Sequence, residues 1–462
     1  MSVYWQAAGV SAVAAALYSL SPLSAICIVV MAWMAQRAVA DLGPAERRWF
    51  GGALVVGILL RLVSVLGVFL LTTDRAQFNV LFGDGRFAVD ESIWILNRVM
   101  GVPISPYYWS STFENFGDVG YHHALAVIQW WLGQAPYAIG LINIVFFEAF
   151  TIIFYRLTRL AFGARAGIAA LIAVLFWPTI FVWSFSTMKE SIQLALAAGA
   201  LAGTVAFVRA RGSAARLKAS AGVAVALLVL SELRPGSSVM VTSAIVFGLL
   251  AHAAMRRTST TAVALGLIVV GVLAGATRPW VQARVQFETR LALVRHIGHV
   301  RSRGISYRAA DERFYTGDKE TPWSMTAAEG ERFLVRSAAA FFLAPLPSDI
   351  RSAAAWLFVP LNLAWYVLLA LAAFGIPTGL RRDRLVTLLS IGYVAAGLVV
   401  IAPNSGNIGT LVRHRDMVVP FVMCLSSVGL IQILSTLAPA PPRQPPAAPG
   451  CPLEGDVCHA AD

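Results

Sequence analysis

The chain has 462 residues, of which 58% are hydrophobic and 13% charged, and its formal net charge at pH 7 is +12. Soluble domains are about 45–50% apolar and about 25% charged, so this composition excludes a soluble enzyme, a collagen-like chain, a disulfide scaffold and a disordered protein. Apolar runs of about 17 to 25 residues, the length that crosses a bilayer core, recur along the sequence and predict an all-α polytopic membrane protein.

About eleven transmembrane helices are expected, in one bundle over residues 1–437. The candidate spans are 9–35, 50–72, 137–155, 166–184, 190–208, 219–233, 237–255, 260–277, 353–376, 385–402 and 417–437. The first is one kinked helix or a short hairpin, because Ser21-Pro22 divides it. The sixth reaches only about 22 Å against a hydrocarbon core of about 30 Å, so a shallow re-entrant hairpin is the alternative to two crossings there.

Basic residues cluster on every second connection between these spans. The five clusters are Arg37, Arg47 and Arg48; Arg156, Arg159 and Arg165; Arg209, Arg211, Arg216 and Lys218; Arg256 and Arg257; and Arg381, Arg382 and Arg384. Cytoplasmic loops collect Lys and Arg, so we expect all five on the cytoplasmic side and the other loops outside. The positive charge therefore reflects membrane topology and an Arg-rich composition, and no nucleic-acid partner is expected.

Two outward loops, 73–136 and 278–350, are too long to be simple turns. In the first, residues 87–99 predict a short helix; in the second, residues 330–343 predict an amphipathic helix on the outer leaflet. The many Arg residues of the second loop either contact an anionic lipid carrier or a growing polysaccharide, or form a salt-bridged cap over a cavity. Residues 438–462 are rich in Pro and predict a disordered cytoplasmic tail.

Three carboxylates, Asp84, Asp90 and Glu91, lie within eight residues just beyond the second span. A carboxylate that is partly desolvated at the membrane edge has a raised pKa, which suits it to accept a proton from a hydroxyl group. The alternative is that Asp84 caps the helix that begins near Arg86, while the other two acids are simply exposed to water.

Several motifs occur in an order that resembles the GT-C superfamily of membrane glycosyltransferases. They are Gly83-Asp84-Gly85-Arg86-Phe87-Ala88, Gly120-Tyr121-His122-His123-Ala124 running to Trp130-Trp131-Leu132-Gly133, Arg159-Leu160-Ala161-Phe162-Gly163, Trp177-Pro178 followed by Ser184-Phe185-Ser186-Thr187-Met188-Lys189-Glu190, and Arg413-His414-Arg415-Asp416 with Pro420. The chain is similar in this order to the lipid A aminoarabinose, galacturonosyl and protein mannosyl transferases. It departs from the pattern at Phe87, where Tyr is commoner, at His122 and His123, which replace prolines, and in an additional apolar segment before the helix that leads to Asp84.

The resemblance implies sugar transfer from a polyprenyl-phosphate-linked donor to a glycan, lipid or protein acceptor, on the outer face of the cytoplasmic membrane. Such transfer needs an acid or base at the acceptor hydroxyl and cations at the departing phosphate. The implied catalytic residue is Asp84, with Asp90 and Glu91 beside it. The implied phosphate-binding cations are Lys189, Arg234, Arg413 and Arg415, and the implied acceptor residues are Tyr121, His122 and His123. Each cation alternatively extends to the lipid headgroups.

A divalent cation, Mg or Mn, is left open. His122 and His123, with Asp118 and Glu114 near them in sequence, supply groups of the type that bind metals, but adjacent histidines point in different directions on a regular element, and no metal site is assigned. The ionisable residues are expected at the membrane edges, with Arg61 as the deep one that needs a partner inside the bundle.

Three other functions compete with a transferase. A polysaccharide polymerase of the O-antigen or capsule type has a similar number of spans and a long basic outward loop, and would not need an acid after the second span. A flippase for lipid-linked oligosaccharides, or another transporter, would place ionisable groups deep in the spans. A non-catalytic assembly subunit is the third alternative.

Overall fold

The computed structural model describes residues 21–71, 83–105, 120–134, 136–255, 274–275, 277–302, 305–318, 320–346, 356 and 358–437, without the side chains of residues 83, 84, 86 and 136. Within these ranges every regular element is helical, apart from one isolated bridge between Ser306 and Asn407. Nine of the described helices are long and apolar enough to cross a membrane. The prediction of an all-helical fold is therefore confirmed for the described residues, which contain the long apolar helices that a multi-pass membrane protein needs. Most of the predicted span 260–277 and all of the tail 438–462 lie outside the described residues.

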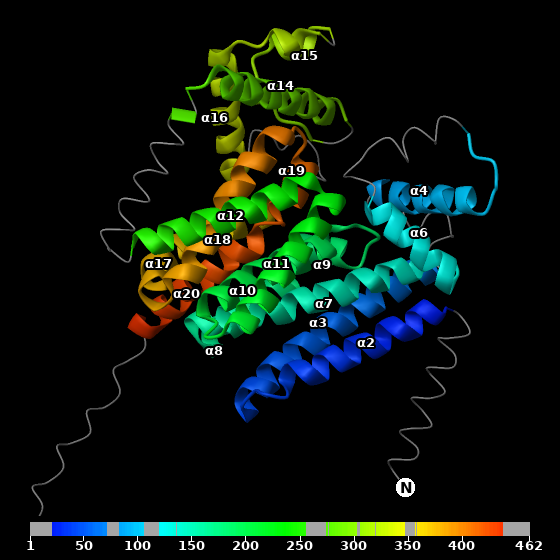
Figure 1. Ribbon diagram of the computed structural model, residues 1–462, viewed down its shortest axis with the longest axis vertical. Helices are drawn as coiled ribbons and strands as arrows, with labels where there is room; N and C mark the ends of the chain where they lie inside the picture. The colour runs from blue at the N-terminus through cyan, green and yellow to red at the C-terminus, as the bar shows by residue number, and fades with distance from the viewer. Residues whose placement is uncertain are drawn as a thin grey trace, which may run out of the picture.

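The nine long helices form the bundle in Figure 1. They are α2 (Pro22–Val39), α3 (Pro44–Leu71), α7 (Pro136–Phe162), α10 (Glu190–Arg209), α11 (Ser213–Leu233), α12 (Pro235–Ala254), α17 (Phe358–Arg382), α18 (Arg384–Ile401) and α20 (Val419–Leu437). The shorter elements are α4 (Gly83–Val99), α6 (Gly120–Leu132), α8 (Ala164–Phe176), α9 (Pro178–Ser184), α14 (Pro279–Arg301), α15 (Arg313–Thr316), η1 (Thr321–Ser324), α16 (Ala327–Leu343), η4 (Ala402–Asn404) and α19 (Ile408–Arg415).

The predicted span 166–184 is present as two helices, α8 and α9, which together are apolar enough to cross a membrane but are bent by 65° where they meet. Pro178 has no N–H and disfavours the helical conformation of the residue before it, so Trp177 is extended, with ψ of 120°. The bend is stabilised by Arg61, which is fully buried. Arg61 donates from Nη2 to the Leu175 carbonyl at 3.0 Å and from Nε to Ser184 Oγ at 2.6 Å. The deep arginine thus binds the backbone and a hydroxyl at a broken helix.

The sixth span is longer than its apolar part indicates. Helix α11 has 21 residues and includes Arg216 and Lys218, which the apolar pattern excludes. At 1.5 Å per residue it is about 32 Å long, enough to cross the core. Helices α11 and α12, which are joined at Arg234, are therefore each long and apolar enough to cross a membrane.

A second ionisable side chain lies deep in the bundle. Glu148 is fully buried within α7, which corrects the expectation that Arg61 is the deep one. Glu148 lies inside the predicted span 137–155, and one acidic residue does not change the apolar character of that run. The hydropathy pattern therefore did not identify Glu148 as a deep ionisable residue.

Helices α17 and α20 cross closely at two glycines. A Cβ atom on Gly375 would overlap the carbonyl oxygen of Leu425, and one on Gly429 would overlap the carbonyl oxygen of Leu371. Small residues at such a crossing let two membrane helices approach backbone to backbone. This contact holds α20, and with it the segment that precedes it, against the rest of the bundle.

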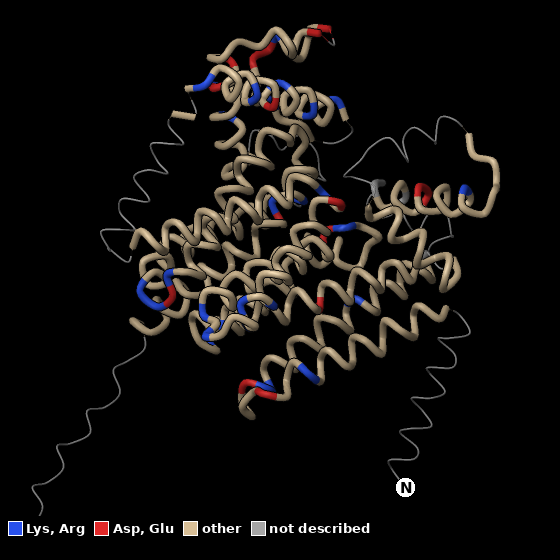
Figure 2. Tube along the Cα trace, viewed as in Figure 1, with Lys and Arg blue, Asp and Glu red and all other residues tan. Residues whose placement is uncertain are grey.

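Four of the five basic clusters lie at one end of the bundle, and the fifth, Arg256 and Arg257, lies outside the described residues. Arg159 pairs with Glu46. Arg382 donates to the Phe162 carbonyl at 3.0 Å, and Arg209 pairs with Asp383. Figure 2 shows that charged residues gather at the ends of the long helices and on the part above them, while the middle of the bundle is largely uncharged. The four described clusters thus share one end, as a common cytoplasmic side requires.

The opposite end carries two projecting parts. The pair α4 and α6 stands on one side, and a cap of α14, α15, η1 and α16 stands on the other (Figure 1). In the cap the amphipathic helix is present as α16, and its N-terminus has a capping box between Thr326 and Glu329. Arg332 and Arg336 of this helix each lie 2.7 Å from an oxygen of Asp311. Salt bridges thus hold the described parts of the second loop together.

The cap is joined to the bundle just before α19. The amide of Tyr307 donates to the Gly406 carbonyl at 3.1 Å, and the amide of Ile408 donates to the Ile305 carbonyl at 2.8 Å. A side chain at position 406 would overlap the carbonyl oxygen of His296, so this contact requires glycine. The joint fixes the cap relative to α19, which carries Arg413 and His414.

Candidate functional site

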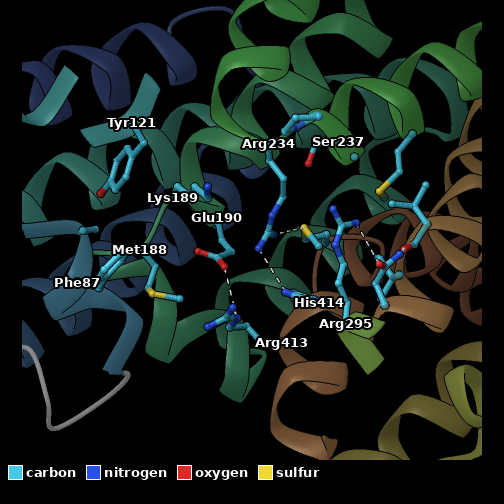
Figure 3. Close-up of a pocket in the computed structure, with 18 of the residues that line it drawn as sticks. Phe87, Tyr121, Met188, Lys189, Glu190, Arg234, Ser237, Arg295, Arg413 and His414 are labelled. Atoms are coloured by element: carbon cyan, nitrogen blue, oxygen red, sulfur yellow. Dashed lines mark hydrogen bonds and ion pairs between the residues drawn. The ribbon is translucent and has the colours of Figure 1, made fainter. Parts of the chain in front are cut away.

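A cavity of about 710 Å³ lies between the two projecting parts. Its walls come from α4, α6, the N-terminal ends of α10 and α12, the cap helix α14, the end of α18 with η4, and α19 (Figure 3). This volume is in the range of small-molecule sites. Segments far apart in the sequence therefore contribute to one concave surface at the end of the bundle opposite the basic clusters.

Three of the predicted cations line this cavity: Lys189, Arg234 and Arg413. Lys189 is the residue before α10, and its Nζ donates to the carbonyl oxygen of Leu233 at 2.8 Å. Leu233 is the last residue of α11 and precedes Arg234. The turn before α10 and the turn between α11 and α12 are thereby tied together, which brings two basic residues from separate turns to one wall.

An acidic residue lies among these cations. Glu190 begins α10, is 1% exposed, and has its Oε1 3.5 Å from Nε of Arg413. A carboxylate in the first turn is favoured by the partial positive charge of the helix N-terminus. Glu190 thus supplies a negative charge to the cavity.

Arg234 contacts a histidine of α19. Its Nη2 lies 3.3 Å from Nε2 of His414, and its Nη1 lies 3.3 Å from Sδ of Met417 (Figure 3). Burial, followed by the charges of Arg234 and Arg413, holds the pKa of His414 well below its usual range. Because a guanidinium has only donors, the neutral imidazole is the acceptor in this contact.

The wall formed by α4 and α6 contains an acid and a histidine. Oε2 of Glu91 lies 2.5 Å from Nδ1 of His122, and both residues are buried. The hydroxyl of the neighbouring Tyr121 donates to the Thr187 carbonyl at 2.8 Å, and burial, together with the charge of Glu190, raises the pKa of that hydroxyl. Tyr121 therefore stays protonated and fixes α6 to the turn that leads to Lys189.

The cap contributes cavity residues that the sequence did not single out. Arg295 donates from Nη1 to Oδ1 of Asn404 at 3.3 Å, and His299 donates from Nδ1 to the Asn404 carbonyl at 2.8 Å. With Gly298 they line the cavity from one face of α14, which the spacing of three and four residues on a helix predicts. That spacing was visible in the sequence, but the helix itself was not recognised.

Arg415 was predicted at the phosphate site, but it does not line the cavity. It is 4% exposed, donates from Nη1 to Oδ1 of Asn362 at 3.1 Å and from Nη2 to the Ala344 carbonyl at 2.6 Å. Its side chain also lies 5.2 Å from the ring centre of Trp365. Arg415 thus joins α19 to α17 and to the segment after α16.

The remaining predicted residues are placed as follows. Asp90 lies on α4 and His123 on α6, but neither lines the cavity. Asp84 lies in the first turn of α4, and its side chain is outside the described part. Among the described residues no three His, Cys, Asp or Glu side chains gather as a metal site, and Glu114 and Asp118 fall outside those residues.

The described walls of the cavity thus combine four cations, Lys189, Arg234, Arg295 and Arg413, with two carboxylates, Glu91 and Glu190. The surplus of positive charge favours an anionic ligand, and Arg in particular can grip phosphate oxygens with two parallel hydrogen bonds. In comparisons with known proteins, no family model matches the chain, and no curated protein does so either.

Proposed function

We propose that the chain is a cell-envelope glycosyltransferase that takes a sugar from a polyprenyl-phosphate- or diphosphate-linked donor. The acceptor is a glycan, lipid or protein at the outer face of the cytoplasmic membrane. The observation that supports this most is the convergence of Lys189, Arg234, Arg295 and Arg413, from four segments, on one cavity whose other wall carries Glu91 and His122. A phosphorylated leaving group needs cations such as these four, and an acceptor hydroxyl needs acid or base groups.

The position of the cavity supports an outward-facing site. It lies at the N-terminal ends of α10 and α12, whereas Arg209, at the other end of α10, belongs to the basic end. Since basic connections remain in the cytoplasm, the cavity opens on the outer side in this proposal. A donor held in the outer leaflet by its polyprenyl chain reaches such a site by moving within the membrane.

The proposed step is a direct displacement at the anomeric carbon. The acceptor oxygen forms a bond to that carbon, the bond from the carbon to the phosphate oxygen breaks, and the polyprenyl phosphate leaves with the electron pair. The acceptor proton passes to a carboxylate of α4, which the family resemblance assigns to Asp84. The cations stabilise the negative charge that grows on the leaving phosphate as its bond to the sugar breaks.

The roles of the other residues follow from this step. Lys189, Arg234, Arg295 and Arg413 bind the phosphate side of the donor. Glu91 holds the His122 ring by the 2.5 Å contact, so the pair can bind a sugar hydroxyl on the wall that faces the cations. The sugar then lies between the two walls.

The test is transfer from a lipid-linked donor by the purified full chain in nanodiscs. Nanodiscs with polyprenyl-linked sugars extracted from bacterial membranes are incubated with an extract of envelope glycans, and the released polyprenyl phosphate is measured. We expect release with the wild-type chain and none with Asp84→Asn, at equal folded protein. Release that Asp84→Asn leaves unchanged contradicts the mechanism and favours a polymerase that needs no acid after the second span. No release from the wild type with any donor contradicts the proposal itself.

A further inference from the structure

Helices α10 and α12 both direct their N-terminal ends into the cavity. Lys189 is the capping position of α10, and Arg234 is the capping position of α12. The first N–H groups of a helix have no acceptor within the helix, and the helix dipole adds partial positive charge there. Each of these ends, with its basic residue, therefore stabilises a negative charge.

The two helix ends differ in what accompanies them. Helix α10 begins with Glu190, so its own carboxylate provides the negative charge. Helix α12 begins with Pro235, Gly236 and Ser237 and has no acidic residue in its first turn. The N-terminal end of α12 therefore has donors and positive charge that suit an anion, but no carboxylate in its own first turn to neutralise them.

Ser237 gives independent evidence for a ligand at this end. The side chain is 1% exposed and lines the cavity, and its Oγ has no hydrogen-bond partner among the residues that the structure describes. A buried hydroxyl without a partner loses its hydrogen bonds to water and gains none in return, so such a group calls for an explanation. Figure 3 labels Ser237 and Arg234 among the residues that line the cavity. A ligand oxygen bound here would satisfy the Ser237 hydroxyl.

Gly236 provides a backbone donor beside this hydroxyl. Pro235 has no N–H, so the amide of Gly236 is the first in the helix, and within α12 it has no acceptor. A Cβ atom at position 236 would lie 3.0 Å from Cγ1 of Val400, so the backbone here runs close to the neighbouring wall. Glycine thus keeps this amide beside the cavity without a side chain to crowd it.

We infer that the N-terminus of α12 is a phosphoryl-binding site, formed by the Gly236 amide, the Ser237 hydroxyl and the Arg234 guanidinium. Backbone amides, a hydroxyl and a guanidinium at a helix N-terminus suit a phosphate oxygen because all of them donate hydrogen bonds and the dipole favours the charge. The inference rests on the proposed function for the view that this phosphoryl group belongs to a lipid donor. The recognition of a phosphoryl group does not depend on sugar transfer.

The test is calorimetric titration of the full chain in phosphatidylcholine nanodiscs with inorganic phosphate and with pyrophosphate. We expect Ser237→Ala to weaken binding about tenfold, since a hydrogen bond to a charged group is lost. Ser191→Ala is the matched control. Ser191 is also fully buried, its Oγ also has no hydrogen-bond partner among the described residues, and it lies near the start of α10, but it does not line the cavity. Its binding should equal that of the wild type.

A second set of nanodiscs contains undecaprenyl phosphate. If the lipid headgroup uses the same site, it competes with inorganic phosphate in the wild type and about tenfold less in Ser237→Ala. Failure to compete assigns the site to free phosphate and contradicts the lipid source.

Two results overturn the inference. One is the absence of phosphate and pyrophosphate binding by the wild-type chain, and the other is unchanged binding by Ser237→Ala. If Ser237→Ala does not fold, Arg234→Gln is titrated with phosphate in its place, and phosphate binding equal to that of the wild type overturns the inference. Ser237-dependent binding without any sugar transfer leaves the phosphoryl site in place and removes the proposed transferase.

Discussion

Arg234 holds its guanidinium Nη2 3.3 Å from Nε2 of His414, in a contact in which the histidine must accept. The acceptor has to be unprotonated, which agrees with a pKa held well below the usual range by burial and by Arg234 and Arg413. His414 is therefore a neutral residue that orients the arginine at the start of α12. It adds no positive charge to the cavity.

The first prediction concerns this orientation. His414→Gln keeps an acceptor oxygen near the position of Nε2, whereas His414→Ala removes it. We expect the Ala variant to bind inorganic phosphate about fivefold more weakly, because Arg234 loses its acceptor, and the Gln variant to stay close to the wild type. Titration of both variants in nanodiscs measures the difference. Equal binding by the Ala variant and the wild type would show that the contact does not orient Arg234 for a ligand.

The second prediction concerns the acid in the cavity. Glu190→Gln removes the negative charge 3.5 Å from Arg413, and a phosphate then meets less repulsion. We expect the affinity of Glu190→Gln for phosphate to be about fivefold higher than that of the wild type. A small loss of stability should accompany it, because α10 loses an acid in its first turn. Glu232→Gln is the control, since Glu232 is exposed and does not line the cavity. Weaker phosphate binding by Glu190→Gln would mean that the carboxylate helps to bind the ligand.

Much of the bundle could be predicted because apolar length and charge act locally. Spans such as 385–402 and 417–437 agree with α18 and α20 to within a few residues. The structure differs from the predicted spans where local patterns are ambiguous. Pro178 divides a span whose apolar run is continuous, and Arg216 with Lys218 lengthens a helix whose apolar run is short. Hydropathy alone registers neither the missing N–H of proline nor the ability of long basic side chains to extend a helix into water.

The candidate site was only partly predictable, because sequence position does not fix the direction of a side chain. Arg413 and Arg415 are two residues apart on one short helix, and such residues point to different sides of a helix. Arg413 lines the cavity and Arg415 binds Asn362. The hydroxyl of Ser237 carries no sequence signal beyond its place after Pro235 in a first turn. Its importance depends on which other segments surround it.

The third prediction separates a cavity arginine from a structural one by the same substitution. Arg234→Lys should weaken phosphate binding about fivefold with little change in stability, because lysine cannot bind with two parallel hydrogen bonds. Arg415→Lys should leave phosphate binding unchanged and lower the free energy of unfolding by about 2 kcal/mol. It loses buried charged hydrogen bonds to Asn362 and Ala344.

Phosphate titration and thermal unfolding of the two variants in the same detergent check this pair. A strong loss of phosphate binding in Arg415→Lys, with unchanged unfolding, would return Arg415 to the phosphate site that its sequence position suggested.

The last prediction concerns the pH dependence of cap stability. His296 is fully buried, donates from Nδ1 to the Ser405 carbonyl at 2.6 Å, and accepts at Nε2 from the Tyr315 hydroxyl at 3.0 Å. Burial lowers the pKa of His296 from 6.5 to about 4. Between pH 6.5 and 4 the unfolded chain therefore binds more protons than the folded chain, so stability is complete above this window and is lost as pH falls through it. The loss from this residue is at most about 3 kcal/mol.

Thermal unfolding of the full chain at several pH values from 7.5 to 5 measures this dependence. The wild type should lose stability toward pH 5, and His296→Asn should lose less over the same range while being less stable at pH 7.5. His414 has a pKa shifted in the same direction and so leaves a residual slope in the variant. Glu329, whose pKa is lowered to about 2 by Arg313 and the Thr326 amide, loses its contribution only below this range. The same substitution at His123, which lies in α6 outside the cap, is the control. The change of stability with pH could be as steep in His296→Asn as in the wild type and the His123 control. That result would show that another group, and not His296 at the joint between cap and bundle, responds to pH.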